Sequence, residues 1–214
     1  MFTGIVEELG TITNMQQSGE AMKLTIHANN ILSDVKLGDS IAVNGICLTV
    51  TSFTPTSFTV DAMPETMKST SLRLLKSHSK VNLERAMAAD GRFGGHFVSG
   101  HIDGIGTILT KKQHYNAVYY KIAISDELLR YCLHKGSVAV DGTSLTIFDI
   151  DDSSITISLI PHTVSESVIG DKNAGDIVNI ECDMIGKYIE RFITKPVKRT
   201  DSMTEIFLQE NGFL

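Results

Sequence analysis

The sequence predicts a mostly β protein made of two homologous antiparallel domains, each a small barrel or sandwich, followed by a helical tail. Three observations lead to this fold class. One eight-residue pattern occurs twice, short alternating segments recur about every 8–12 residues, and an apolar stripe with helical spacing follows the second copy. A chain of 214 residues has room for two domains of roughly 100 residues each.

The repeat is centred on residues 43–50, which read VNGICLTV, and on residues 140–147, which read VDGTSLTI. Four further blocks recur in the same order, at offsets of 96 or 97 residues. They are residues 2–7 and 98–103, 10–12 and 106–108, 63–66 and 160–163, and 81–84 and 178–181.

Five blocks in one order indicate a tandem duplication, and the glycine-rich residues 90–95 are the natural linker between the copies. We therefore expect one domain at residues 1–94, a second at residues 95–184 and a helical segment for oligomerisation at residues 185–214.

Alternating hydrophobic residues predict strands within each copy. The clearest are residues 24–28 and 57–61, which correspond to residues 120–124 and 154–158. Helical turns are expected between the strands, at residues 30–34, 65–75, 126–132 (with Ser125 as N-cap) and 163–169.

The tail carries the only pattern without a counterpart in the first copy. Ile185, Ile189 and Phe192 form an apolar stripe on a helix that Pro196 should end. Residues 202–205 resemble a capping box that opens a second short helix. The stripe must be covered, either by the chain's own domains or by self-association between subunits.

Composition limits the classes of partner. The net charge is −6, with 25 acidic and 19 basic residues, which argues against nucleic acid or an anionic membrane as the main partner. No stretch approaches about 18 consecutive apolar residues, so we expect no spanning helix. Residues 1–8 lack a basic n-region and carry acids where the apolar part of a secretory signal would lie, so we expect no such signal. Three cysteines without C-x-x-C spacing favour reduced thiols and a cytoplasmic location.

The polar residues of the repeated pattern are the first candidates for a site. Residues i and i+2 of a strand share a face, so Cys47 and Thr49 lie opposite to Leu48. The same holds for Ser144 and Thr146 in the second copy. One such face could simply be solvated, but the same choice in both copies favours a ligand site on the flank of each barrel.

Other chemistries have weaker support. Cys47 has no His–acid pair at a recognisable spacing, so a packing role is favoured over a nucleophilic one. A metal site of His101, Asp103 and His162 would have to be an innovation of the second copy, so we expect no metal. His101 follows Gly100, where a ligand can approach the backbone, and better suits an acid–base or orienting role. The glycine clusters match no phosphate-binding loop.

Four motifs together resemble the riboflavin synthase family (alpha chain). They are MFTGIV at residues 1–6, NGICLTV at residues 44–50, GGHFVSGHID at residues 94–103 and KGSVAVDGTSLT at residues 135–146. The resemblance covers essentially residues 1–200 and is specific, because several long motifs occur in the family's order and spacing.

The resemblance implies two six-stranded antiparallel Greek-key barrels in tandem plus a C-terminal α-helix, through which the chain forms a homotrimer. It also implies a reaction without cofactors, in which two molecules of 6,7-dimethyl-8-ribityllumazine are dismutated. A four-carbon unit passes from one to the other and gives riboflavin and 5-amino-6-ribitylamino-uracil, the last step of riboflavin biosynthesis. Each barrel would hold one lumazine, with the active site between the N-terminal barrel of one subunit and the C-terminal barrel of its neighbour. Association with lumazine synthase is left open.

Carried over position by position, the resemblance implies one set of substrate-binding residues in each domain. The N-terminal set is Phe2, Thr3, Gly4, Ile5, Val6, Cys47, Leu48, Thr49, Asp61, Ala62, Met63, Pro64, Glu65 and Thr66. The C-terminal set is Gly100, His101, Ile102, Lys135, Ser144, Leu145, Thr146, Ser158, Leu159, Ile160, Pro161, His162 and Thr163.

Five members of these sets are also catalytic candidates, together with Ser40, which aligns with Ser137. The five are Cys47, Thr49, His101, Ser144 and Thr146. We expect His101, with Ser144 and Thr146 as relays, to take a proton from the acidic C7 methyl group of one lumazine. Cys47 and Thr49 would orient or activate the other molecule.

Two other classes of function stay open on the sequence alone. One is a non-catalytic lumazine- or flavin-binding protein, and the other is a purely structural tandem barrel. Binding relatives tend to lose the polar pocket residues in one copy. Both copies here keep a hydroxyl or thiol, a threonine and a glycine, which favours an enzyme.

Overall fold

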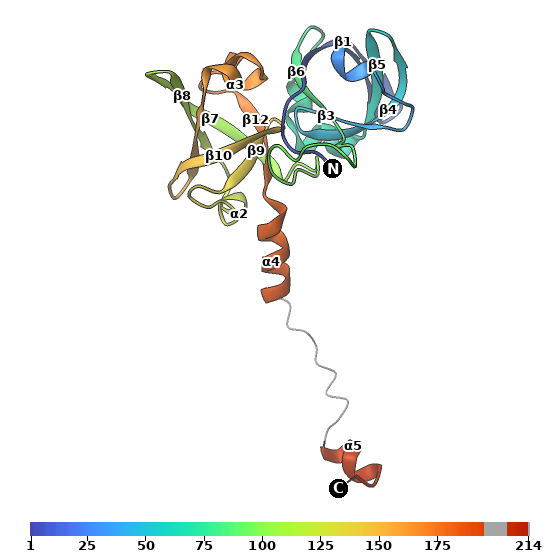
Figure 1. The fold of residues 1–214 in the computed structure, drawn as a ribbon, viewed down its shortest axis with the longest axis vertical. Helices are drawn as coiled ribbons and strands as arrows, with labels where there is room; N and C mark the ends of the chain where they lie inside the picture. Colours follow the sequence, from blue (N-terminus) through green and yellow to red (C-terminus); the bar gives the residue numbers. More distant parts are fainter. Residues whose placement is uncertain (195–204, 214) are drawn as a thin grey trace. The chain divides into compact units, whose positions relative to one another are not determined.

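The computed structural model describes residues 1–194 and 205–213 and divides the chain into two compact units, Met1–Met184 and Ile185–Leu214 (Figure 1). The first unit contains two closed antiparallel barrels of six strands each. The fold class expected from the repeat and the strand pattern is therefore confirmed.

The first barrel closes in the strand order β1-β2-β5-β4-β3-β6, so the chain crosses from β2 to β3, which pairs with β6, and only β5 returns beside β2, in Greek-key fashion. Its strands are β1 (Glu8–Ser18), β2 (Ala21–His27), β3 (Ser40–Val43), β4 (Ile46–Thr54), β5 (Ser57–Ala62) and β6 (Lys80–Arg85). Three short helices connect them: η1 (Asn30–Leu32), α1 (Pro64–Ser69) and η2 (Ser71–Leu74).

The second barrel repeats this connectivity in the order β7-β8-β11-β10-β9-β12. Its strands are β7 (Gly104–His114), β8 (Ala117–Ala123), β9 (Ser137–Val140), β10 (Thr143–Ile150), β11 (Ser154–Leu159) and β12 (Ile177–Cys182). Its helices are α2 (Asp126–Leu129), α3 (Pro161–Ser165) and η3 (Val168–Asp171).

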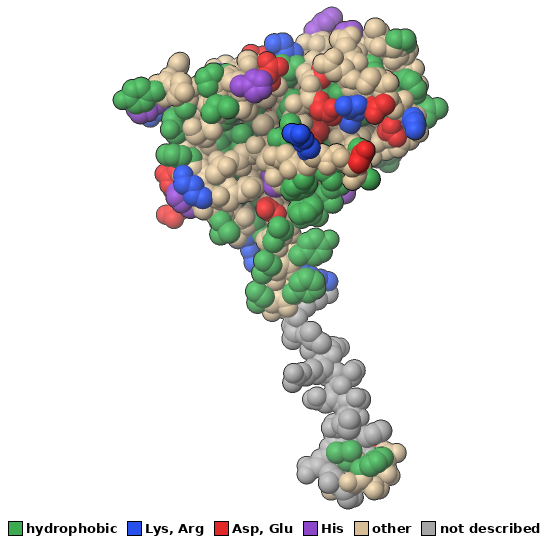
Figure 2. All heavy atoms as spheres, in the orientation of Figure 1, with side chains coloured by type: hydrophobic (Ala, Val, Ile, Leu, Met, Phe, Trp, Pro, Cys, Tyr) green, Lys and Arg blue, Asp and Glu red, His purple; other side chains and the backbone are tan. Residues whose placement is uncertain are grey.

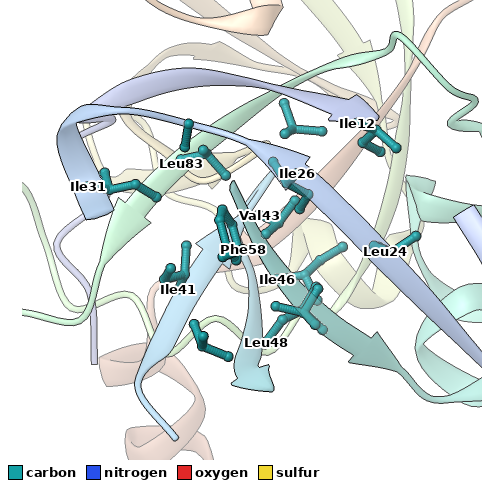
Figure 3. Close-up of a cluster of buried hydrophobic side chains, with 14 of the residues drawn as sticks. Ile12, Leu24, Ile26, Ile31, Ile41, Val43, Ile46, Leu48, Phe58 and Leu83 are labelled. Atoms are coloured by element: carbon teal, nitrogen blue, oxygen red, sulfur yellow. The ribbon is translucent and has the colours of Figure 1, made fainter. Parts of the chain in front are cut away.

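Each barrel is filled by the aliphatic residues of its alternating strands. In the first barrel, Ile41, Leu48 and Phe58 project from neighbouring strands into one buried cluster (Figure 3). An equivalent cluster fills the second barrel. Because one face of every strand is buried, a one-residue slip would bring polar groups into the core, so this packing fixes the register.

The Asn-Gly and Asp-Gly pairs form the β3–β4 and β9–β10 hairpins. Asn44 and Gly45 have φ values of 46° and 80°, and Asp141 and Gly142 have 44° and 79°. Two consecutive positive φ angles are the signature of a type I′ turn, which suits the twist of paired strands. The two hairpins also touch, because a Cβ added at Gly45 would lie 2.7 Å from the Gly142 nitrogen.

The barrels are joined by a small apolar cluster and a polar network. Phe2 and Val98 are fully buried and form an antiparallel bridge between the two copies of the N-terminal segment. The side chain of Asn82 donates to the Asp141 carbonyl at 2.8 Å, and its counterpart Asn179 donates to the Asn44 carbonyl at 2.9 Å. Equivalent residues of the two copies therefore form the interface between the barrels.

Some local expectations needed correction. Residues 30–34 form only a 3₁₀ turn, and the expected helix over residues 65–75 is divided where Thr70 adopts an extended conformation. Ser125 occupies the N-cap position, but its side chain makes no capping hydrogen bond.

The second unit contains α4 (Met184–Thr194) and α5 (Glu205–Glu210). The predicted stripe is present on α4, where Ile185, Ile189 and Phe192 are all more than half exposed. Figure 2 shows hydrophobic side chains in green along this helix. Pro196 and the capping residues 202–204 lie outside the described residues. No helix in the described part of the chain is long and apolar enough to cross a membrane.

Candidate active site

The outer face of β4 carries polar groups where the pleat predicts them. Leu48 is buried in the barrel, whereas Cys47 is half-buried and Thr49 is exposed. Ser40 lies opposite Thr49 in the β3–β4 pairing, so the catalytic candidates of the first copy share one flank. The predicted outward direction of these side chains is confirmed.

The second barrel presents the same flank on β10. Ser144 is half-buried, Thr146 is exposed, and Ser137 lies opposite Thr146. Leu145, unlike its counterpart Leu48, is only half-buried. All three cysteines of the chain are free thiols, as expected.

The segments around Gly4 and Gly100 each pack on the barrel that is formed by the other copy of the repeat. The Ser144 nitrogen on β10 donates to the Gly4 carbonyl at 2.7 Å, and the Cys47 nitrogen on β4 donates to the Gly100 carbonyl at 2.8 Å. Added Cβ atoms at Gly4 and Gly100 would lie 2.6 Å from the Cβ atoms of Ser144 and Cys47, respectively. Both glycines have φ near +80°, which other residues rarely adopt.

This exchange corrects the grouping that the resemblance implied. Gly4, Ile5 and Val6 were expected beside Cys47, and Gly100 with His101 beside Ser144. The segments cross because Phe2 and Val98 pair with each other, which directs each segment onto the opposite barrel. In agreement, Ile102 packs against the core of the first barrel.

His101 itself is exposed and follows the glycine that touches β4. Within one chain, its backbone therefore adjoins the flank of Cys47 and not that of Ser144. The expected relay from His101 to Ser144 and Thr146 would consequently have to form between two chains.

A second histidine, which sequence reasoning missed, contacts Ser144 directly. His96 Nδ1 lies 2.7 Å from Ser144 Oγ, and the ring is 7% exposed. Burial lowers the pKa of His96 below its ordinary value, an effect that Asp183 only partly offsets. Its Nε2 has no hydrogen-bond partner among the described residues. His96 stands in the motif GGHFVSGHID, but its counterpart in the first copy would precede Met1, so the repeat could not reveal it.

Two buried carboxylates, also missed, hold the exchanged segments. Glu84 accepts from the Thr3 nitrogen and hydroxyl and from the Gly4 nitrogen, at 2.7–3.1 Å. Glu181 makes the same contacts with Ser99 and Gly100, at 2.6–3.0 Å. Desolvation raises the pKa of Glu84, although these hydrogen bonds oppose the shift. The sequence does contain a signal for these two glutamates, because they occupy equivalent positions at the ends of the aligned blocks 81–84 and 178–181.

The residues expected at the ends of β5 and β11 and just after them differ in how well they could contact a ligand. Ala62 and Leu159 point into their barrels and are buried, so their side chains cannot contact a molecule on the flank. Met63 and Ile160 are about 60% exposed, as expected for contact residues. The remaining positions expected in these loops are exposed or half-buried: Asp61, Pro64, Glu65, Thr66, Ser158, Pro161, His162 and Thr163. The Lys135 ammonium lies over the Phe148 ring at 4.7 Å from its centroid.

A metal site and a surface cavity were considered as alternatives to the paired flanks. No group of three His, Cys, Asp or Glu side chains suited to a metal occurs among the described residues, so His101, Asp103 and His162 are not gathered. A cavity of about 590 Å³ lies between the N-terminal segment and residues 86–94, and only Thr3 and Ile5 of the expected substrate-binding residues line it. The paired flanks are the better candidates, because they carry the same polar groups in both copies.

The chain is similar to riboflavin synthases and to other proteins with lumazine binding domains. Residues 3–86 and 99–183 each match the family described as the lumazine binding domain. Riboflavin synthases from Bacillus amyloliquefaciens and Actinobacillus pleuropneumoniae are 59% and 54% identical to the chain, and each alignment covers all of both proteins. A crystal structure of LumP complexed with riboflavin matches with a TM-score of 0.79 at 26% identity, over 85% of this chain and 99% of that one. LumP complexed with 6,7-dimethyl-8-(1'-D-ribityl) lumazine matches with a TM-score of 0.77 at 26% identity over the same shares.

Proposed function

The chain belongs to the riboflavin synthase family with its two lumazine-binding domains, and from this membership we propose the reaction that its two flanks perform. Two molecules of 6,7-dimethyl-8-ribityllumazine are dismutated to riboflavin and 5-amino-6-ribitylamino-uracil by transfer of a four-carbon unit. The observation that carries the proposal is the pair of matched polar flanks on β4 and β10. A reaction that consumes two copies of one substrate needs two versions of one pocket.

The first proposed pocket lies on β4 of the N-terminal barrel. It combines Cys47, Thr49 and Ser40 with His101 and Ile102, which arrive from the second copy. The second proposed pocket lies on β10, which carries Ser144 and Thr146, and Ser144 meets the segment Gly4–Val6 at Gly4. His96 belongs to this second pocket through its hydrogen bond to Ser144. Both proposed pockets therefore combine the polar flank of one barrel with a glycine segment of the other copy. They differ in their histidines, with His101 in the first pocket and His96 in the second.

Catalysis depends first on holding the two lumazines against each other. Orienting two reactants can remove roughly 7–11 kcal/mol of the barrier that is due to bringing them together. The C7 methyl group is acidic because its anion is delocalised into the ring, so a weak base at neutral pH suffices. We assign this proton transfer to His101, with Ser144 and Thr146 as relays, and assign orientation of the partner molecule to Cys47 and Thr49.

The proposed active site joins the N-terminal barrel of one subunit to the C-terminal barrel of its neighbour. This arrangement would bring His101 of one chain near Ser144 of another, which the exchange of segments prevents within a single barrel. Self-association through the exposed stripe of α4 into a trimer supports the proposal, since an apolar face of this kind favours burial.

The broader setting is proposed on the same basis. Residues 1–94, 95–184 and 185–214 act as two lumazine-binding domains and an oligomerisation segment. The protein works in the cytoplasm, with lumazine synthase as a candidate partner, and needs neither metal nor cofactor.

Incubation of the purified protein with 6,7-dimethyl-8-ribityllumazine alone tests the function. The proposal predicts riboflavin in solution, detected by its absorption and by chromatography. A bound but unchanged chromophore would identify a binding protein, and the absence of binding would exclude both readings. For the proton-transfer role, His101→Gln should lower turnover at least tenfold while substrate still binds. Near-normal turnover with both pockets occupied would refute this assignment.

A further inference from the structure

Glu84 and Glu181 are buried acids that the proposed reaction does not use. Their exposed fractions are 6% and 1%. Burial of a carboxylate is costly unless donors replace the water that it loses. Each carboxylate meets this need in the same way, because it accepts hydrogen bonds from two consecutive backbone nitrogens and from the hydroxyl of Thr3 or Ser99.

Each carboxylate belongs to one barrel, whereas the backbone that it holds forms part of the other barrel's flank. Glu84 lies on β6 of the first barrel and holds Gly4, whose carbonyl accepts from Ser144 on β10. Glu181 lies on β12 of the second barrel and holds Gly100, whose carbonyl accepts from Cys47 on β4. Two short chains of hydrogen bonds therefore cross between the barrels in opposite directions.

Backbone hydrogen bonds also hold the two glycine segments, through the Phe2–Val98 bridge and through the Gly4 and Gly100 carbonyls. The N–H groups of Gly4 and Gly100, however, are bound by the carboxylates of Glu84 and Glu181. Each glycine has no side chain of its own; a Cβ added at Gly4 would meet Ser144, and one added at Gly100 would meet Cys47 and the Phe2 ring. Hydrogen bonds to an ionised carboxylate are shorter and stronger than those to a neutral group. An amide in place of the carboxylate would turn one acceptor into a donor that faces backbone N–H groups, so at least one bond in each cluster would be lost.

We propose that Glu84 and Glu181 are positioning residues that each set the substrate pocket of the opposite barrel. Glu181 holds the segment Gly100–Ile102 against the β4 pocket, and Glu84 holds the segment Gly4–Val6 against the β10 pocket. The inference rests on the proposed function only in taking these two flanks as the lumazine pockets.

The test measures one pocket at a time in the full-length protein. Thr49→Trp blocks the β4 pocket and Thr146→Trp blocks the β10 pocket, and with one pocket blocked the lumazine cannot be dismutated. Its fluorescence then reports the dissociation constant of the open pocket. Glu181→Gln should weaken the β4 pocket roughly tenfold and leave the β10 pocket within about twofold of its parent. Glu84→Gln should weaken the β10 pocket roughly tenfold and leave the β4 pocket within about twofold of its parent.

Hydrogen exchange followed by mass spectrometry supplies a readout that is independent of ligand. Glu84→Gln should speed exchange in peptides that contain Thr3 and Gly4, and Glu181→Gln in peptides that contain Ser99 and Gly100. If a glutamine variant does not fold, Thr3→Val and Ser99→Ala remove only the hydroxyl bonds and should give smaller shifts in the same crossed pattern.

The crossed pattern decides the outcome. Weakening of the pocket on the same barrel, or equal weakening of both pockets, would overturn the inference and leave a general structural role. Failure of either singly blocked parent to bind lumazine would instead contradict the proposed function, whereas unchanged affinities in both glutamine variants would contradict the inference alone.

Discussion

Replacement of Gly100 by alanine perturbs the point where the second copy of the chain touches the first barrel. The added methyl group would lie 2.6 Å from Cys47 Cβ, 2.9 Å from Phe2 Cε2 and 3.0 Å from the Cys47 nitrogen. Ordinary contacts between carbon atoms are about 3.5–4.0 Å. Backbone atoms cannot rotate away, so either the segment or β4 must move.

Two costs contribute, and a control separates them. Alanine at φ +82° costs roughly 1–2 kcal/mol because of the left-handed backbone, and overpacking adds about 1–3 kcal/mol. Gly175 has φ +95°, but a methyl group there meets no atom of the described chain within 4 Å. Gly175→Ala should therefore show the backbone cost alone. For a unit of this size, 1 kcal/mol lowers the melting temperature by about 2–4 °C.

The assay compares the two variants by calorimetry and by the rate of riboflavin formation. Gly100→Ala should melt roughly 2–12 °C below Gly175→Ala and lose at least tenfold in turnover, because the displaced segment includes His101. Gly175→Ala should keep turnover within about twofold of the parent. Equal melting temperatures and equal rates would refute the close contact between Gly100 and β4.

Three other predictions test separate features. Because burial lowers the pKa of His96, the unfolded chain binds a proton more readily below the ordinary value of 6.5, and stability falls as the pH falls. The melting temperature of His96→Gln should therefore depend less on pH between 7 and 5 than that of the parent, and parallel curves would contradict this. Asp141 is fully buried with its Oδ2 2.8 Å from Lys172 Nζ, so Asp141→Asn should cost about 3 kcal/mol in denaturant unfolding. The double variant Asp141→Asn with Lys172→Leu copies Asn44 and Leu75 of the first repeat and should recover most of this loss, which an additive result would contradict. Thr49→Val and Thr146→Val change exposed positions, so stability should stay within about 0.5 kcal/mol while turnover falls; unchanged rates in both would remove the flanks as the site.

The duplication and the pleat made most of the fold predictable. Offsets of 96 and 97 residues predict two equivalent domains, and alternation along residues 43–50 predicts that Leu48 lies inside and Thr49 outside, as the structure has them. These signals are local or periodic, so one sequence is enough to show them. The division of the helix near Thr70 was missed because a single extended residue leaves no periodic trace.

The pairing of the site residues could not be predicted in the same way. A repeat shows which residues are equivalent, but it does not show whether a segment packs on its own domain or on the other. The bridge between Phe2 and Val98 decides this, and it joins residues 96 positions apart. His96 escaped notice for a related reason, since its partner Ser144 is remote in sequence and its counterpart would precede the chain.

Transfer of a four-carbon unit between two molecules of one substrate is the central claim, and isotope labelling tests it most directly. The protein is incubated with equal amounts of unlabelled lumazine and lumazine carrying ¹³C at C6, C7 and both methyl groups. If donor and acceptor are both lumazines, mass spectrometry will find a quarter of the riboflavin unlabelled, half with one labelled unit and a quarter with two. Riboflavin that never carries two labelled units, or no riboflavin at all, would contradict the account.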